Sequence, residues 1–189
     1  VSRTTRDLMA AHRLTRRPVT VVPNAADEVP RPPQRRNGHA ARTLTYMGAF
    51  LPYKNAAALV RSLAWLPGYT LHLASRIEPR EEARLRALAP ARARVVFHRG
   101  ISDEDYARLL DRSTALVTAS RAEGYGLPIV EAMARGVPVV VTDMPIFREV
   151  TGADAGVGPT VGTQADGGPA EFADPNDPRD FARAVRRLE

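Results

Sequence analysis

The sequence predicts an α/β fold in which one parallel sheet is flanked by helices. Short runs rich in Val, Leu and Thr alternate along the chain with segments in which apolar residues recur at helical spacing. This alternation is typical of βαβ units, whose parallel strands are joined by right-handed crossovers. At 189 residues, the chain is long enough to bury the core of one domain. We therefore expect a Rossmann-like parallel sheet of about six strands.

The expected strands are apolar runs that end at polar or turn-forming residues. They span residues 19–23, 43–48, 69–75, 94–98, 115–120 and 137–142. Helical periodicity predicts helices at residues 5–14, 55–65, 80–88, 103–111, 127–135 and 178–188. Ser102 followed by three acidic residues is a favourable helix start, and Gly136 is a typical helix end. The chain is irregular beyond Asp143 until the last helix, and we expect a mobile loop near residues 25–42.

The composition excludes several kinds of site. The chain has no cysteine, which excludes disulfides, thiolate metal sites and thiol catalysis. No apolar run approaches the roughly 18 to 20 residues of a membrane span, and no signal-peptide core follows the N-terminal charges. We therefore expect a cytoplasmic location.

The net charge of +6 comes from the N-terminal region. Residues 1–42 carry nine arginines and three acidic residues, whereas residues 43–189 hold eighteen basic and eighteen acidic residues. A basic segment of this kind suits an anionic partner such as nucleic acid or a lipid surface. It has no aromatic residues for base stacking, so we expect no nucleic-acid partner. Plain solvation and peripheral membrane contact both stay open for this segment.

Lys54 is the only lysine, beside twenty-six arginines. An ammonium is a compact point charge that suits phosphate oxygens, and the planar guanidinium of arginine is not equivalent to it. The alternative is a solvated lysine at the start of a helix. We take Lys54 as a candidate phosphate ligand.

Two glutamates, Glu123 and Glu131, flank a tight turn between a predicted strand and a predicted helix. The turn contains Gly124, Tyr125, Gly126 and Leu127. Free backbone N–H groups and the helix dipole therefore face the carboxyl end of a strand, where α/β sheets bind phosphate. Glu123 is expected in the loop that faces the ligand. Glu131 projects about one turn further along the helix, where it can accept hydrogen bonds from sugar hydroxyls.

Other interpretations of this turn fit less well. A dinucleotide site needs a third glycine where this chain has Ile129, and a P-loop needs a Gly-Lys-Ser or Gly-Lys-Thr sequence, which does not occur. Hydrolases with paired carboxylates usually place the two acids on separate elements that face each other across the substrate. Either glutamate alone suits an ordinary helix acid, so the functional interpretation depends on the combination.

The segment at residues 120–136, SRAEGYGLPIVEAMARG, closely resembles the E-x7-E segment of the retaining family-4 glycosyltransferases with the GT-B fold. Weaker matches occur in the family's order. They are VVPNA at 21–25, YMGAFLPYKN at 46–55, VFHRG at 96–100, TDMPIFREVTG at 142–152 and FADPNDP at 172–178. The resemblance covers about residues 19–189, which it implies are the nucleotide-sugar-binding half of a GT-B fold. Residues 1–18 resemble the end of the preceding half, or a helix between the halves.

This resemblance implies a role for each residue of the segment. Glu131 would hold the ribose hydroxyls of a nucleotide-sugar donor, and Glu123 would lie at the transferred sugar. Lys54 would neutralise the diphosphate leaving group. The amides of residues 124–127 would approach the sugar and phosphate, as would the backbone at Gly48. Because a lysine and a helix N-terminus can stabilise the leaving diphosphate, no metal or other cofactor is expected.

The nucleotide base would contact the loop formed by His98, Arg99 and Gly100, where we favour a packing role for His98. Ala49 stands where the family often has an arginine, and Arg76 or Arg121 could substitute for that arginine. The N-terminal acceptor domain of a GT-B enzyme is absent from this chain, so we expect no transfer without it. A non-enzymatic nucleotide-binding module and half of a GT-B sugar-nucleotide epimerase are the alternatives.

Overall fold

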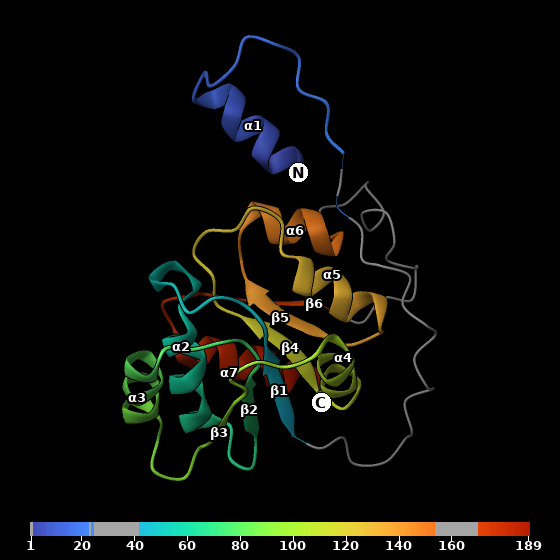
Figure 1. Cartoon of the computed structure of the whole chain (residues 1–189). Helices are drawn as coiled ribbons and strands as arrows, with labels where there is room; N and C mark the ends of the chain where they lie inside the picture. Colours follow the sequence, from blue (N-terminus) through green and yellow to red (C-terminus); the bar gives the residue numbers. More distant parts are fainter. Residues whose placement is uncertain (1, 23, 25–41, 154–169) are drawn as a thin grey trace.

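A six-stranded parallel sheet forms the centre of the described chain (Figure 1). The computed structural model describes residues 2–22, 24, 42–153 and 170–189. The strands are β1 Thr43–Tyr46, β2 Thr70–Leu73, β3 Arg94–Phe97, β4 Ala115–Thr118, β5 Val139–Thr142 and β6 Ala170–Ala173. They lie in the order β3-β2-β1-β4-β5-β6, and every neighbouring pair is parallel. This arrangement confirms the predicted Rossmann-like fold class.

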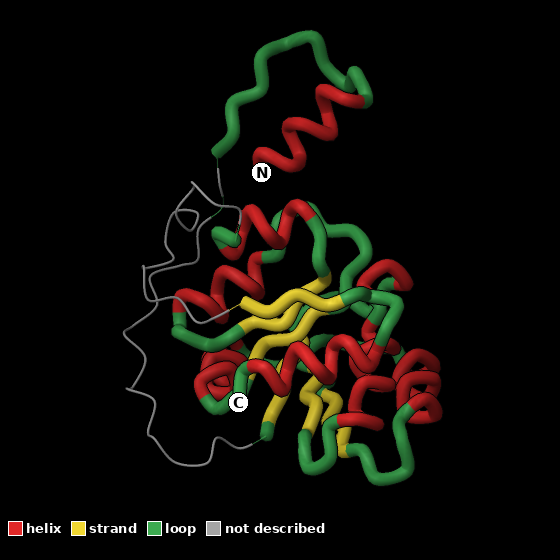
Figure 2. The backbone as a smooth tube through the Cα atoms, turned by 180° about the vertical axis from the view of Figure 1, so that it is seen from behind, coloured by secondary structure: helices red, strands yellow, loops and turns green. Residues whose placement is uncertain are grey.

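Helices cover both faces of the sheet, as the view from behind also shows (Figure 2), whereas α1 lies away from the sheet and contacts α6. The helices of the described chain are α1 Arg3–Ala11, α2 Ala56–Ser62, α3 Pro79–Leu88, α4 Asp103–Asp111, α5 Leu127–Ala134, α6 Pro145–Thr151 and α7 Pro178–Arg187, with 3-10 turns η1 Pro52–Lys54 and η2 Leu63–Trp65. One buried cluster joins the sheet to α2, α3 and α7, and the other joins it to α4, α5 and α6. Alternate strand residues point to opposite faces: Val140 belongs to the first cluster, and Val139 and Val141 to the second.

The order of the strands places a crevice between β1 and β4. The chain moves outward from β1 through β2 to β3, and then returns to the other side of β1 to form β4. The loops that follow β1 and β4 therefore diverge to opposite faces of the sheet. Ligands of open α/β sheets bind at the carboxyl ends of the strands at such a point.

The sixth strand was predicted in the wrong place. Residues 19–22 form no strand, and β6 instead pairs with β5, with Val141 opposite Phe172. The run at 19–22 is β-branched, but Pro18 and the proline at residue 23 flank it, and Val22 is 69% exposed. Nothing in the sequence marks the short segment Ala-Glu-Phe-Ala as a strand, because its position beside β5 comes from tertiary packing.

Helix α6 was also not predicted, because residues beyond Asp143 were expected to be irregular. Its boundaries follow standard signals: Pro145 opens the first turn, and Gly152 ends the helix with φ of 74°. The other predicted helices and strands are confirmed within a few residues at each end. The loop predicted near 25–42 lies outside the described residues, apart from Arg42. No helix in the described part of the chain combines the length and apolar character needed to cross a membrane.

The helix at the N-terminus begins earlier than predicted, at Arg3 instead of Thr5. Its first turn is anchored on α6, because the backbone N–H groups of Arg3 and Thr4 donate to the carboxylate of Glu149 at 2.7 and 2.8 Å. Ser2 caps the same turn by accepting the N–H of Thr5 at 2.9 Å. Residues 3–11 are therefore attached to the domain through polar contacts at one end of α1.

Candidate functional site

A pocket of about 300 Å³ lies at the carboxyl ends of β1 and β4. Its walls come from the loops after these strands, the first turn of α5, and Phe147 of α6. Six predicted site residues line it: Gly48, Lys54, Glu123, Tyr125, Gly126 and Leu127. The crevice expected from the strand order therefore coincides with the residues that the sequence singled out.

Lys54 and Glu123 form an ion pair across this pocket. Lys54 ends η1, and its side-chain amine donates to Oε2 of Glu123, which comes from the loop after β4. The other oxygen, Oε1, accepts the backbone N–H of Gly124 at 3.0 Å. The two side chains are only 15% and 19% exposed. A lysine and a carboxylate far apart in the sequence thus meet in one partly desolvated place.

Tyr46 ends β1 and also lines the pocket, although sequence reasoning did not single it out. Its hydroxyl donates to the carbonyl oxygen of Ala49 at 2.7 Å. Burial, together with the negative charge of Glu123, raises the pKa of Tyr46 well above its usual range, so the hydroxyl stays protonated. A Cβ at Gly48 would lie 2.9 Å from this hydroxyl oxygen, so a larger residue there would have to displace the buried Tyr46 side chain.

The first turn of α5 faces the pocket from the β4 side. Gly126 adopts the left-handed region with φ of 92°, and a Cβ there would lie 3.0 Å from Ile129 and 3.1 Å from Phe147. Only glycine combines this conformation with this close packing. Since Gly126 and Leu127 both line the pocket, the positive end of the helix dipole faces it. The pocket therefore offers a lysine and a helix N-terminus to an anion.

The hydroxyl of Tyr125 makes a hydrogen bond to the backbone of the segment before the sheet. The side chain is 6% exposed, and the hydroxyl donates to the carbonyl oxygen of Asn24 at 2.7 Å. Asn24 also lines the pocket. Tyr125 thus connects the site loop to the segment that precedes the sheet.

Glu131 is not among the residues that line this pocket. It lies one turn further along α5, beside Tyr106 of α4 and Arg135. Burial raises the pKa of Tyr106, the charge of Glu131 raises it further, and Arg135 opposes that effect. Arg135 itself binds Asp111 through two hydrogen bonds of 2.8 and 2.6 Å. Glu131 therefore belongs to a polar cluster between α4 and α5, about 6 Å along the helix axis from Leu127.

The loop after β3 lies apart from the pocket. The rings of His98 and His72 stack with centroids 5.2 Å apart, and Nδ1 of His72 lies 2.9 Å from Nε2 of His98. Burial lowers the pKa of both imidazoles; the neighbouring His98 lowers that of His72 further, while Asp105 partly opposes the effect on His98. Arg99 binds Glu82 at 2.9 and 3.1 Å.

A second, open hollow of about 510 Å³ lies beside this loop. It contains Ala49, Arg76 and Arg99. Gly100 adjoins it with φ of 131°, and a Cβ there would lie 4.0 Å from Nε of Arg76. Arg121 points elsewhere, since its guanidinium donates to Asn176 at 3.0 Å. Neither candidate replacement for the arginine missing at Ala49 lines the first pocket.

The described residues contain no group of three or more His, Asp or Glu side chains arranged to hold a metal ion. Sequence reasoning also missed Phe147 as part of the site, because it lies on the helix that was not predicted. Asn55, directly after Lys54, was expected only as a helix start. It adopts a left-handed conformation with φ of 52°, which asparagine tolerates better than most residues.

Comparison with known proteins identifies relatives of this chain. Seven curated proteins match, each named as a mannosyltransferase. The serotype-specific mannosyltransferase WbdA of Escherichia coli is 50% identical over 50 residues, which are 26% of this chain and 6% of that protein. The MMP alpha-(1->4)-mannosyltransferase of Mycolicibacterium hassiacum is 32% identical over 127 residues, which are 64% of this chain and 31% of that protein. The chain thus matches only a minor part of the length of these relatives.

Among solved structures, S. aureus TarM, in a complex that includes UDP, superposes with a TM-score of 0.68 at 15% identity. The match covers 98% of this chain and 36% of that chain. Identity at this level shows the fold alone. The family model for glycosyl transferases group 1, in contrast, matches the sequence at residues 32–189. Since that range is most of the chain, the protein belongs to the group 1 glycosyl transferase family.

Proposed function

We propose that this chain is the C-terminal, donor-binding half of a retaining glycosyltransferase that transfers a mannosyl group from a nucleoside-diphosphate sugar to an acceptor. The observation that carries the proposal is the pairing of Lys54 with Glu123 at the positive end of α5, inside a pocket at the crevice of the sheet. The names of the relatives support a mannosyl donor.

The pocket suits the chemistry of the leaving group. Breaking the bond between a sugar and a diphosphate develops negative charge on the diphosphate oxygens. Lys54 and the N-terminus of α5 would stabilise that charge as it forms, and the largely apolar lining of the pocket would strengthen the interaction. With these two groups in place, we propose that the reaction needs no metal.

The remaining predicted residues would bind the other parts of the donor. Glu123 would accept a hydrogen bond from a hydroxyl of the transferred sugar once Lys54 has turned to the phosphates. Glu131, one turn along α5, would accept hydrogen bonds from the ribose. The loop of His98, Arg99 and Gly100 would border the nucleotide base.

The acceptor would bind to a further domain, as the GT-B resemblance implies, so the chain alone would bind the donor without transferring the sugar. A panel of UDP, GDP and ADP and their mannose derivatives in a thermal-shift assay tests donor binding. A product assay with the same donors tests for turnover. Stabilisation by at least one nucleoside diphosphate without sugar transfer is expected. No stabilisation by any of them would overturn the proposal.

A further inference from the structure

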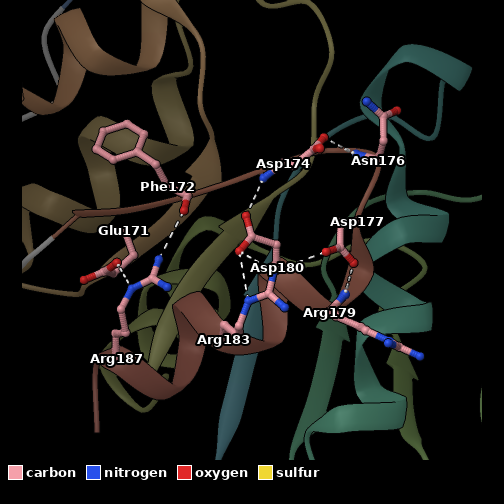
Figure 3. Close-up of polar contacts among 9 residues, drawn as sticks. All are labelled: Glu171, Phe172, Asp174, Asn176, Asp177, Arg179, Asp180, Arg183 and Arg187. Atoms are coloured by element: carbon pink, nitrogen blue, oxygen red, sulfur yellow. Dashed lines mark hydrogen bonds and ion pairs between the residues drawn. The ribbon is translucent and has the colours of Figure 1, made fainter.

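The turn between β6 and α7, residues 174–177, holds its shape through its own polar contacts (Figure 3). The backbone N–H of Asp174 donates to Asp180 at 2.9 Å, and that of Asn176 donates to Asp174 at 2.8 Å. Arg183, in the next turn of α7, donates hydrogen bonds from its guanidinium to the carboxylates of Asp177 and Asp180, at 3.2 and 3.0 Å. We call residues 174–177 the C-terminal turn. Several bonds that share partners define its conformation.

The C-terminal turn contacts the loop that carries Lys54. Nδ2 of Asn55 donates to the carbonyl oxygen of Pro175 at 2.8 Å, in a partly buried contact. Asn55 follows Lys54 directly and adopts the left-handed conformation, with φ of 52° and ψ of 36°. Strained backbone of this kind persists where surrounding contacts hold it in place. The bond to Pro175 is therefore made at the point where η1 ends and α2 begins, by the residue directly after Lys54.

The same turn contacts the loop that carries Glu123. The guanidinium of Arg121, two residues before Glu123, donates to Oδ1 of Asn176 at 3.0 Å. The backbone N–H of Arg121 donates to the carbonyl oxygen of Tyr53 at 2.7 Å, which joins the two site loops directly. The exposed contact with Asn176 is the weaker of the two links to the C-terminal turn, because water competes for its partners.

We propose that the C-terminal turn holds Lys54 opposite Glu123, with Asn55 and Asn176 as positioning residues for the diphosphate site. This inference rests on the proposed function. Neither asparagine lines the pocket, so each acts through a neighbour: Asn55 through Lys54, and Asn176 through the loop of Glu123. Asn55 carries the larger share, because its contact is short and partly buried.

Two substitutions separate the side-chain contact from the backbone conformation. Asn55→Gly keeps access to the left-handed region and removes the amide. Asn55→Asp keeps a residue that tolerates this region and removes the donor, while it adds a negative charge beside Lys54. If both variants change the affinity for the ligand in the same way, the change is due to the lost hydrogen bond to Pro175, since only this loss is common to both.

The readout is the phosphate preference, defined as the Kd of the nucleoside divided by the Kd of the matching nucleoside diphosphate. Loss of the contact with Pro175 should lower this ratio by about threefold to tenfold, the usual effect of one hydrogen bond. Asn176→Ala should lower it less. Arg187→Gln is the matched control, because Arg187 also makes exposed polar contacts with β6, to Glu171 and Phe172 (Figure 3), but does not line the pocket.

A double-mutant cycle distinguishes positioning from general stabilisation. If Asn55 acts through Lys54, Asn55→Gly should not lower the phosphate preference further in a Lys54→Ala background. A merely structural role would lower the Tm and leave the ratio unchanged in both backgrounds. An unchanged ratio in both Asn55 variants, with wild type preferring the diphosphate, would overturn the inference. A wild type without any phosphate preference would instead contradict the proposed function itself.

Discussion

The amine of Lys54 binds the carboxylate of Glu123 inside the pocket, and the same carboxylate accepts the backbone N–H of Gly124. Lys54 thus has an anionic partner before any donor arrives. Under the proposed function, a diphosphate would compete with Glu123 for Lys54, and its arrival would free one oxygen of Glu123 for a sugar hydroxyl. The pair would then link the binding of the diphosphate to the binding of the sugar.

Removal of the lysine should weaken diphosphate binding specifically. Lys54→Ala is expected to cost roughly 1.5 to 3 kcal/mol of binding free energy for a nucleoside diphosphate, and much less for the nucleoside, because the ammonium contacts phosphate oxygens. Lys54→Arg should restore only part of the loss, since the planar guanidinium fits a point-charge site poorly. Calorimetric titration at one fixed salt concentration measures both. Equal diphosphate affinities of wild type, Lys54→Ala and Lys54→Arg would show that Lys54 does not bind phosphate.

Glu123→Gln should have a different effect on the two kinds of ligand. Without its charged competitor, Lys54 is free for phosphate, so affinity for a plain nucleoside diphosphate should be unchanged or higher. Affinity for the nucleotide sugar should be unchanged or lower, because the amide of glutamine is a weaker acceptor for a sugar hydroxyl than the carboxylate of Glu123. Calorimetry with the two ligands measures the contrast. A loss of diphosphate affinity as large as that of Lys54→Ala would contradict this division of roles.

Glu131→Ala should weaken the binding of every ligand that contains ribose. The loss of hydrogen bonds from ribose hydroxyls to a charged acceptor should cost roughly 1.5 to 3 kcal/mol. Affinity for the 2′-deoxy analogue of the diphosphate should fall less, because it already lacks one of these hydroxyls. Competition binding with the ribo and deoxy ligands gives the comparison, and equal losses for both would show that Glu131 acts elsewhere.

Gly126→Ala should lower the free energy of unfolding. Gly126 also lines the pocket, so this position serves both the fold and the site. The residue has φ of 92°, and a Cβ would approach Ile129 and Phe147 to 3.0 and 3.1 Å. A cost of about 1 to 3 kcal/mol is expected in urea denaturation. Gly124→Ala is the matched control in the same loop, since nothing lies within 4 Å of a Cβ there. Equal stability of both variants would show that the turn can relax.

The stacked histidines should make stability depend on pH. The pKa values of His72 and His98 are lowered in the folded protein from the ordinary value of 6.5, so folding favours the neutral rings. Their contribution is complete above pH 6.5 and is lost as the pH falls through the lowered values. Asp105, which raises the pKa of His98, reduces the effect. Urea denaturation from about pH 7 to about pH 5 should therefore show falling stability.

His98→Phe keeps a stacked ring and removes one titrating group, so it should flatten this pH dependence. Identical slopes in wild type and His98→Phe would show that the histidine pair does not determine the pH dependence of stability.

The sequence predicted the turn between β4 and α5 well because its signals are local. Gly126 and Gly136 lie at the two ends of α5, and the turn between Glu123 and Glu131 indicated where the site lies. Two of the errors depend on tertiary packing: β6 is a strand because it lies beside β5, and residues 19–22 have no such neighbour among the described residues. Helix α6 was missed although Pro145 and Gly152 give local signals for its ends.

The arrangement of side chains was less accessible to sequence reasoning than the list of site residues. Lys54 and Glu123 are 69 positions apart, and only the order of the strands brings their loops together. The contact of Asn55 with Pro175 spans 120 positions. Neither residue type nor spacing signals a contact of this range, so the roles of Asn55 and Tyr46 emerge only from the structure.

The single lysine allows a direct test of whether the pocket binds the diphosphate of a nucleotide sugar through Lys54. Labelling with 15N-lysine gives one side-chain amine signal for the whole chain in an NMR spectrum, since no other lysine is present. Titration with a nucleoside diphosphate should shift this signal saturably as the amine leaves Glu123 for phosphate, and the matching nucleoside should not shift it. An amine signal that stays in place while the diphosphate binds elsewhere on the chain would show that Lys54 does not bind the diphosphate.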